Sequence, residues 1–255
     1  MSALLNARQI CKKYTLGKGN AHQALKDVSL RIDEGEFVSV MGPSGSGKST
    51  LLYNISGMDR ADSGSVTFAG SDIVLLSEKE LAKLRLSKMG FVFQRGNLLK
   101  NLSIFDNIIV AAYLSGKDTR AVINNRATRL MRQTGISHLK DNDITQISGG
   151  EMQRASICRA LINEPAILFG DEPTGALNSR AANEIMDIFC GINQKGGTIL
   201  LVTHDAKVAA RSDRVLFMMD GQIKGEFFLG KYSPDESGWK NRETSLTGWL
   251  SKMGF

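Results

Sequence analysis

A glycine-rich loop at residues 42–50 limits the folds open to this chain more than any other segment. Its sequence, Gly-Pro-Ser-Gly-Ser-Gly-Lys-Ser-Thr, fits the phosphate-loop pattern G-x-x-x-x-G-K-[ST]. The apolar residues 37–41 precede the loop, and a helical pattern over residues 51–58 follows it. A glycine-rich turn with only a structural role is the alternative. The complete motif between a strand and a helix favours a phosphate site in an α/β fold.

Each residue type in this loop suits a triphosphate and its metal ion. The glycines allow backbone amides to curl around phosphate oxygens, and the N-terminus of the following helix adds partial positive charge. We expect Lys48 to reach the β and γ phosphates of ATP and Ser49 to bind Mg²⁺. The predicted nucleotide-binding residues of the loop are Gly42, Ser44, Gly45, Ser46, Gly47, Lys48, Ser49 and Thr50.

A second segment with exposed backbone amides lies much later in the chain. Ser148, Gly149, Gly150 and Glu151 fit the capping pattern S-x-x-E and predict a capped start for a helix over residues 152–163. The same amides can approach a phosphate closely, so the structural and the anion-binding interpretations are compatible. Two sets of such amides exceed what one triphosphate needs from one chain. The second set therefore indicates a second copy of the chain.

Two carboxylates follow an apolar strand. Residues 166–169 are apolar and lead to Asp171 and Glu172, at the strand end where open α/β sheets bind their ligands. We expect Asp171 to hold Mg²⁺, directly or through water, and Glu172 to polarise the attacking water as a general base. A solvated acidic turn is the alternative, and the phosphate loop makes it the weaker interpretation.

Three further side chains are candidates for the site. Gln94 ends an apolar strand, where its amide could ligate Mg²⁺ or orient water, or be only a polar strand terminus. His204 follows another strand and can donate to a γ phosphate, although a lone histidine is more often a capping or packing residue. Tyr14 precedes a Gly17-Lys18-Gly19 loop, predicted as flexible, and can either stack on a purine or pack at a strand end.

Alternating strand and helix patterns predict a mainly parallel sheet covered on both faces. Helical periodicity interrupts the alternation at about residues 95–163 and predicts an inserted helical subdomain. Asp220-Gly221, between two apolar stretches, predicts a β-hairpin. Near the C-terminus, four apolar residues recur at helical spacing and predict a docking helix or, alternatively, a membrane-surface or partner contact: Leu246, Trp249, Leu250 and Met253.

Composition excludes several classes of protein. With 42% hydrophobic and 23% charged residues, the 255-residue chain has an ordinary globular composition. The apolar runs are far shorter than the ~20 residues that cross a bilayer, and no secretory signal is visible, so we expect a cytosolic address. Cys11, Cys158 and Cys190 are scattered and odd in number, which favours reduced thiols. The net charge of +6 would suit an anionic surface, but the basic residues are dispersed.

The order of these motifs resembles that of the ATP-binding cassette (ABC) ATPases. The resemblance covers residues 4–228 and leaves 229–255 as a C-terminal extension with a short amphipathic helix. It implies a P-loop NTPase (RecA-like) core with a mainly parallel sheet, an antiparallel β subdomain and an inserted α-helical signature subdomain. It assigns Walker A to residues 42–50, the Q-loop to Gln94, the signature to Ser148–Gln153, Walker B to Asp171 and Glu172, the D-loop to residues 176–178, the switch histidine to His204 and the A-loop to Tyr14.

The same resemblance implies a head-to-tail dimer, in which Walker A of one copy and the signature of the other enclose each ATP. Residues 93–99 and 171–177 resemble the MacB, LolD and bacitracin-resistance (Bce) group. That group implies an integral membrane permease of FtsX/MacB type, contacted through residues 97–113, and a peripheral position on the cytoplasmic face of the membrane. Two residues depart from the family pattern. Asn178 replaces the usual aspartate and lacks its charge, and Glu151 replaces the usual glutamine and adds a charge.

The resemblance thus implies transport-coupled hydrolysis of ATP with Mg²⁺ as cofactor. Export or removal of an antimicrobial peptide is the favoured task, while lipoprotein release or regulation of cell-wall hydrolases would use nearly the same ATPase. A soluble cassette ATPase acting on ribosomes or nucleic acid is the alternative from a different class. Such proteins usually carry tandem cassettes or long coiled coils, which this sequence lacks, so we expect no nucleic acid partner.

Overall fold

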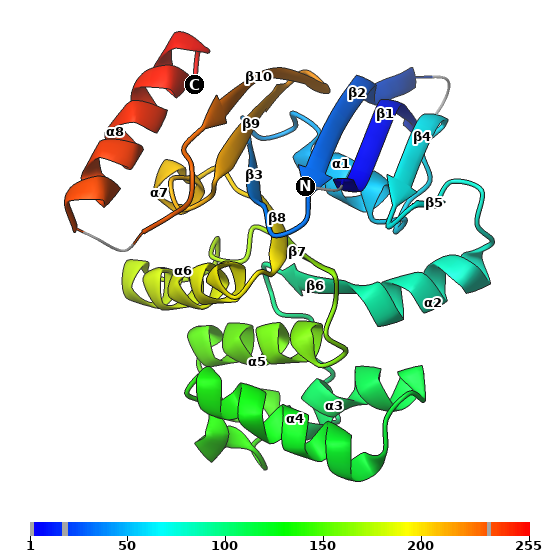
Figure 1. Cartoon of the computed structure of the whole chain (residues 1–255), viewed down its shortest axis with the longest axis vertical. Helices are drawn as coiled ribbons and strands as arrows, with labels where there is room; N and C mark the ends of the chain where they lie inside the picture. Colours follow the sequence, from blue (N-terminus) through cyan, green and yellow to red (C-terminus); the bar gives the residue numbers. More distant parts are fainter. Residues whose placement is uncertain (1–2, 17–19, 234–235) are drawn as a thin grey trace. The chain divides into compact units, whose positions relative to one another are not determined.

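The computed structural model describes residues 3–16, 20–233 and 236–255, so the predicted Gly17-Lys18-Gly19 loop lies outside the described residues. The chain separates into two compact units (Figure 1). The first unit comprises Met1–Leu81 and Asn193–Phe255, and the second comprises Ala82–Ile192. The predicted limits of an ATPase domain at 4–228 and of a C-terminal extension follow a different division and stay predictions.

One sheet of the first unit is entirely antiparallel. Its strands lie in the order β2-β1-β4-β5, with bounds β1 Ala3–Leu16, β2 Asn20–Asp33, β4 Ser63–Phe68 and β5 Ser71–Asp72. Apolar side chains at alternate positions of β1 and β2, such as Leu5 and Ile32, are fully buried, as period-two strands require. Tyr14 pairs with His22 near the end of the β1–β2 ladder.

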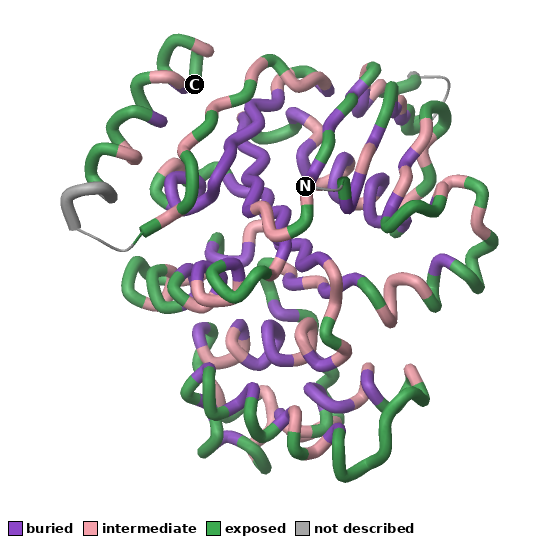
Figure 2. Tube along the Cα trace, in the orientation of Figure 1, coloured by how far each residue is buried: buried purple, intermediate pink, exposed green. Residues whose placement is uncertain are grey.

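The other sheet of the first unit is mixed. Its strands lie in the order β10-β9-β3-β8, with bounds β3 Phe37–Met41, β8 Thr198–Val202, β9 Arg214–Met219 and β10 Gln222–Phe228. Strand β3 runs parallel to both β8 and β9, and β9 forms the predicted hairpin with β10. Strands β3 and β8 are buried along their whole length, as expected for inner strands of a parallel sheet (Figure 2).

Helices α1, α7 and α8 lie in the described part of the first unit. Helix α1 (Lys48–Ile55) begins inside the glycine-rich loop, three residues before the predicted helical stretch, and α7 (Ala206–Ala209) follows β8. Helix α8 (Glu236–Lys252) contains the predicted apolar stripe except for Met253, which follows the end of the helix. Leu246 and Leu250 are 0% and 2% exposed and pack in a cluster with β9 and α7 residues. The stripe therefore docks on the protein itself, which favours that interpretation over a membrane-surface contact.

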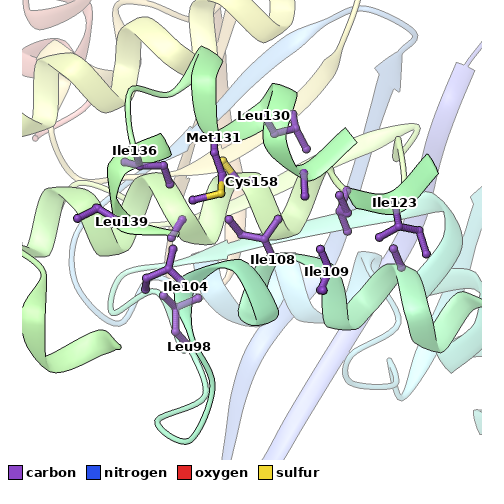
Figure 3. Packing of buried hydrophobic residues seen from close by; sticks show 14 residues of the cluster. Leu98, Ile104, Ile108, Ile109, Ile123, Leu130, Met131, Ile136, Leu139 and Cys158 are labelled. Atoms are coloured by element: carbon purple, nitrogen blue, oxygen red, sulfur yellow. The ribbon is translucent and has the colours of Figure 1, made fainter. Parts of the chain in front are cut away.

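The second unit combines two parallel strands with a helical bundle. Strands β6 (Met89–Phe93) and β7 (Ile167–Asp171) pair in parallel. Its helices are α3 Ile104–Ser115, α4 Arg120–Gln133, α5 Gly149–Leu161 and most of α6 Ser179–Gln194, with short 3₁₀ turns at Ser137–Leu139 and Ile144–Gln146. Side chains of α3, α4 and α5 fill one apolar core that includes Ile104, Ile108 and Cys158 (Figure 3).

The predicted α/β class with an antiparallel β subdomain is confirmed. Helix α2 (Glu78–Lys88) crosses from the first unit into the second. A capping box precedes it, in which the Ser77 backbone amide donates to Glu80 Oε2 at 2.8 Å. None of the helices in the described part of the chain is both long and apolar enough to span a membrane.

Candidate functional site

The glycine-rich loop leaves β3 at Gly42 and enters α1 at Lys48 in the first unit. The Lys48 ammonium turns back over the loop and donates to the carbonyl oxygens of Gly42 at 2.9 Å and of Pro43 at 2.8 Å. Lys48 is only 7% exposed. A buried ammonium held by carbonyls at the mouth of a turn is a preformed positive centre for an anion.

Two glycines of the loop occupy positions that no other residue could take without a backbone shift. A Cβ at Gly42 would lie 1.9 Å from the carbonyl oxygen of Met218, and a Cβ at Gly47 would lie 2.5 Å from that of Ala24. Gly47 also has φ +99°, in the left-handed region that side chains disfavour. Close approach of neighbouring backbone, as well as turn geometry, therefore requires these glycines.

The start of α1 has the groups that a phosphate needs. Its N-cap Gly47 supplies no side-chain cap, and the first turn contains no acidic residue, so neither competes with an anion for the terminal amides. The hydroxyl of Ser46 is buried and makes no hydrogen bond. Unused donors beside a buried lysine fit an oxyanion ligand such as a phosphate group.

His204 lies at the same strand edge of the first unit as the loop. Val202 of β8 is in register with Val40 of β3, and Thr203 donates its amide to the Val40 carbonyl at 3.1 Å. His204 lies two residues after Val202, and Gly42 lies two residues after Val40. The exposed imidazole thus follows β8 where the phosphate loop follows β3.

Tyr14 is held by a carboxylate that the sequence pattern did not single out. Its hydroxyl donates to Asp59 Oδ2 at 2.7 Å, and Lys12 Nζ donates to Asp59 Oδ1 at 2.9 Å. The Lys12 ammonium also lies 5.2 Å from the centroid of the Tyr14 ring. Tyr14 remains 36% exposed, so the ring is fixed at its hydroxyl while part of its surface stays accessible.

In the second unit, Gln94 and Glu172 come together. Phe93 of β6 and Asp171 of β7 are in register, so the next residues, Gln94 and Glu172, leave the two strands side by side. A Cβ built on Gly175 would lie 2.9 Å from Gln94 Nε2 and 3.2 Å from Glu172 Oε2. Both functional groups therefore lie against Gly175, because its hydrogen atom leaves free the space that a methyl group would fill.

The backbone of Glu172 has an unusual conformation. Its φ is +47°, in the left-handed region that costs a residue with a side chain about 1 kcal/mol or more. The amide of Gly175 donates to the Glu172 carbonyl at 3.0 Å and closes the turn. Strained backbone conformations of this kind are concentrated at functional sites, which supports the predicted importance of this residue.

The Ser148–Glu151 segment forms the predicted capping box at the start of α5. The Ser148 amide and hydroxyl donate to Glu151 Oε2 at 2.8 and 2.7 Å, and the Glu151 amide donates to Ser148 Oγ at 3.4 Å. These hydrogen bonds from Ser148 hold the pKa of the Glu151 carboxyl below its ordinary value of 4.5. His138 Nε2 lies 3.5 Å from the other carboxylate oxygen.

Helix α5 is tied to the segment around Gln94 by side chains of the same helix. Gln153 Nε2 donates to the Phe93 carbonyl at 2.9 Å, and the Arg159 guanidinium donates to the carbonyls of Gly96 and Asn97 at 2.6 and 2.8 Å. The capped end of α5 and the end of β6 are thus connected within the second unit.

Asn178, the first departure from the family pattern, caps the next helix. Its side-chain oxygen accepts from the Ala181 amide at 2.9 Å at the start of α6. Asparagine is among the best N-cap residues, so the loss of a charged group here leaves the cap intact.

The described structure thus places the sequence-predicted residues in two groups. The loop, Tyr14 and His204 belong to the first unit, whereas Gln94, Asp171, Glu172 and residues 148–151 belong to the second. Asp59 and Gly175 escaped sequence reasoning. No local pattern links Asp59 to Tyr14 across 45 residues, and Gly175 reads as an ordinary turn glycine after Pro173.

Comparison with known proteins gives one consistent result. The profile of the family described as ABC transporter matches residues 25–175. The chain is 42% identical over 232 residues to the bacitracin export ATP-binding protein BceA of Halalkalibacterium halodurans, with 91% of each chain covered. It is 39% identical to the lipoprotein-releasing system ATP-binding protein LolD 1 of Chlorobium chlorochromatii, with 87% of this chain and 91% of that one covered.

A longer relative matches over only part of its length. The macrolide export ATP-binding/permease protein MacB of Bradyrhizobium diazoefficiens is 41% identical over 220 residues, which cover 86% of this chain but 33% of that protein. Among solved structures, the ATP-binding cassette MJ0796, as a post-hydrolysis dimer bound to ADP and Pi, superposes with a TM-score of 0.83 at 36% identity. The match covers 89% of this chain and 100% of that one.

Proposed function

The chain belongs to the ABC transporter family as an ABC-type ATPase, and on this basis we propose that it drives a separate membrane permease by binding and hydrolysing ATP. The observation that carries the proposal is the meeting of Gln94 and Glu172 over Gly175, because hydrolysis needs a carboxylate beside a group that can orient water.

Phosphate binding falls to the first unit. Lys48 would exchange its two carbonyl contacts for the β and γ phosphates of ATP, and the amides of residues 44–50 and the Ser46 hydroxyl would surround the phosphate oxygens. His204, which follows the neighbouring strand, would donate to the γ phosphate. Tyr14 would stack on the purine base through its accessible surface.

Hydrolysis falls to the second unit. Glu172 would take a proton from the attacking water, and Gln94 would orient that water, because the two groups lie over the same glycine. Ser49, Gln94 and Asp171 would hold Mg²⁺, and their hydroxyl, amide and carboxylate oxygens are the ligands that this ion prefers. When bound, Mg²⁺ would supply positive charge that stabilises the negative charge developing on the phosphates during transfer.

Pairing of two copies would complete each site. The backbone amides at the start of α5 can bind a phosphate. One chain has a complete phosphate loop of its own and needs no second phosphate site for the same ATP. The Ser148 hydroxyl and the amides of Gly149 and Gly150 would therefore bind the γ phosphate held by the other copy. The dimeric cassette structures of MJ0796 support the pairing of two copies.

A pocket of about 400 Å³ between α3 and α4 suits a permease contact. Its lining residues are Leu102, Asp106, Ile109, Val110, Tyr113 and Arg120. An apolar floor between an acidic and a basic side chain fits a short amphipathic helix of a cytoplasmic permease loop. The docked chain would then lie peripherally on the cytoplasmic face of the membrane.

Export of an antimicrobial peptide, as named for the bacitracin-export relative, is the task we favour. The second candidate is lipoprotein release, which the similarity to LolD 1 supports at nearly the same identity. The two tasks differ in the permease and its cargo. Copurification of the permease from native membranes, followed by its identification, would therefore decide between them.

The decisive test of the ATPase assignment replaces Glu172 by glutamine. Glu172→Gln keeps the size of the side chain and one acceptor oxygen but removes the base, so ATP should still bind while its hydrolysis falls at least 100-fold. We expect dimers with retained ATP to accumulate in size-exclusion chromatography. Measurements of phosphate release and of bound nucleotide would separate the two effects.

A matched control is available in the same unit. Glu164 also has a left-handed backbone, with φ +52°, but its side chain is 63% exposed beside Arg126 and Arg129. Glu164→Gln should leave turnover unchanged. Near-normal hydrolysis by the Glu172→Gln variant would remove the base role from Glu172.

A further inference from the structure

The predicted base-stacking residue and two neighbouring side chains form one cluster, which we call the Tyr14 cluster: Lys12, Tyr14 and Asp59. Asp59 accepts from the Tyr14 hydroxyl on one carboxylate oxygen at 2.7 Å and from the Lys12 ammonium on the other at 2.9 Å. Lys12 also donates to the Arg60 carbonyl at 2.6 Å and is only 9% exposed. Both oxygens of Asp59 are thus engaged in charge-assisted or short hydrogen bonds.

The cluster restrains the orientation of the tyrosine ring as well as its position. The hydroxyl is fixed at Asp59, and the Lys12 ammonium lies 5.2 Å from the ring centroid. An ammonium over one face leaves the opposite face for a planar base. A ring held at its tip and on one face can present the remaining face without first losing rotational freedom.

The cluster is also connected to the phosphate loop through α1. The helix begins at Lys48, and at its other end the amides of Met58 and Asp59 both donate to the Tyr53 carbonyl, at 2.9 and 3.0 Å. One short rigid element therefore carries the phosphate loop at its start and the carboxylate that holds Tyr14 after its end. The helix thus fixes the distance between the phosphate loop and the carboxylate that holds Tyr14.

The protonation states suit this role at neutral pH. Burial, followed by the hydrogen bond and charge of Asp59, raises the pKa of Tyr14 to about 12. Burial alone would raise the pKa of Asp59, but hydrogen bonds from Lys12 and Tyr14 outweigh it and hold that pKa below 3.8. The phenol therefore stays a donor and the carboxylate stays an acceptor.

We propose that Asp59, oriented by Lys12, is a positioning residue for the nucleobase: it fixes the Tyr14 ring at a set distance from the phosphate loop and so contributes to ATP affinity through the base. The inference rests on the proposed stacking role of Tyr14. It assigns to Asp59 an effect on KM and none on the chemical step. The ligand group concerned is a planar purine attached to a triphosphate.

The test compares two substitutions of the tyrosine. Tyr14→Phe keeps the ring and leaves the Lys12–Asp59 pair intact, so it removes only the hydroxyl that Asp59 holds. We expect KM for MgATP to rise about threefold to tenfold with kcat unchanged, because a hydrogen bond that only positions the ring should contribute no more than a typical net hydrogen bond. Inorganic tripolyphosphate, a competitive probe without a base, should inhibit the variant and the parent chain with the same inhibition constant.

A second variant identifies the partner of the hydroxyl. Asp59→Asn removes the charge that strengthens the hydrogen bond from Tyr14, so KM should rise by a similar factor. The double variant Tyr14→Phe/Asp59→Asn should raise KM by less than the product of the two single factors, because both changes act on that one hydrogen bond. Asp62→Asn is the matched control, since Asp62 also lies near Lys12, at 3.9 Å, but does not hold the hydroxyl. Equal changes in the tripolyphosphate constant would instead show a structural defect and overturn the proposal.

Tyr14→Ala separates this inference from the stacking role on which it rests. An unchanged KM in Tyr14→Ala would refute base stacking itself. A raised KM in Tyr14→Ala together with an unchanged KM in Tyr14→Phe would leave stacking in place and refute the positioning role of Asp59. Only a raised KM in both tyrosine variants, without additivity with Asp59→Asn, supports the proposal.

Discussion

At the scale of single residues, the candidate hydrolytic site depends on an absent side chain as much as on those present. Gln94 Nε2 and Glu172 Oε2 occupy the space beside Gly175 that a Cβ would need. Gly175 itself has no left-handed backbone, so an added methyl group would meet these atoms without any backbone penalty. Because both atoms end flexible side chains, they can move aside at little cost to the fold.

Gly175→Ala should therefore uncouple folding from activity. We expect a thermal midpoint within a few degrees of the parent chain and a loss of ATP turnover of about tenfold or more, since displacement of catalytic groups by ~1 Å can cost 100-fold. Gly191→Ala in α6 is the control, because nothing lies within 4 Å of its added Cβ. That control should be neutral or stabilising. Full turnover in Gly175→Ala would contradict the arrangement inferred here for Gln94 and Glu172.

At the scale of elements, α8 is attached by one arginine and an apolar stripe. The Arg242 guanidinium donates to the carbonyls of Ala210, Ser212 and Leu229 at 2.9, 2.7 and 2.9 Å. Trp249 stacks on Phe227 with ring centroids 5.3 Å apart. The helix therefore belongs to the packing of the first unit, whose β9 and α7 it covers.

Truncation of the stripe should destabilise the first unit. Leu246 is fully buried, so Leu246→Ala should cost about 2–5 kcal/mol of unfolding free energy, measured by urea denaturation. Leu75→Ala is the control, because Leu75 is 82% exposed and its truncation should change stability by less than ~0.5 kcal/mol. Equal effects of the two substitutions would mean that α8 does not dock as described.

Elements defined by local patterns were predictable, and contacts between distant segments were not. Strand β3 has the predicted bounds because its residues, apolar except for Ser39, lead directly into the phosphate loop. The capping box at Ser148 was readable because its partner is three residues away. The hydrogen bond of Tyr14 to Asp59 and the backbone conformation of Glu172 depend on tertiary context, which no local spacing encodes.

At the scale of the whole molecule, the candidate residues for ATP binding and hydrolysis are divided between the two units. The proposed permease contact lies on the second unit. The phosphate loop belongs to the first unit and Asp171 and Glu172 to the second, so the proposed phosphate binding and the proposed water activation draw on residues of different units. The pocket between α3 and α4 lies in the second unit, which also contains Glu172. The proposed permease contact and the proposed base thus share one compact body.

Val110→Lys tests that contact. The charge would enter the apolar floor of the pocket, so copurification with the permease should fall at least tenfold while the ATPase activity of the isolated chain stays unchanged. Val122→Lys on α4 is the matched control, because Val122 is 44% exposed and does not line the pocket. Undiminished recovery of the permease with Val110→Lys would place the contact elsewhere.

The left-handed backbone at Glu172 has a consequence for which substitutions this position can accept during evolution. Glycine adopts this conformation without strain, so replacing Glu172 by glycine would recover ~1 kcal/mol of backbone strain. The greater conformational entropy of glycine in the unfolded chain would cost ~0.5–1 kcal/mol, so the two effects about cancel. Mutation to glycine would thus erase the proposed base at little cost in backbone conformation. Selection for turnover is therefore a reason to retain the carboxylate that backbone strain alone does not supply.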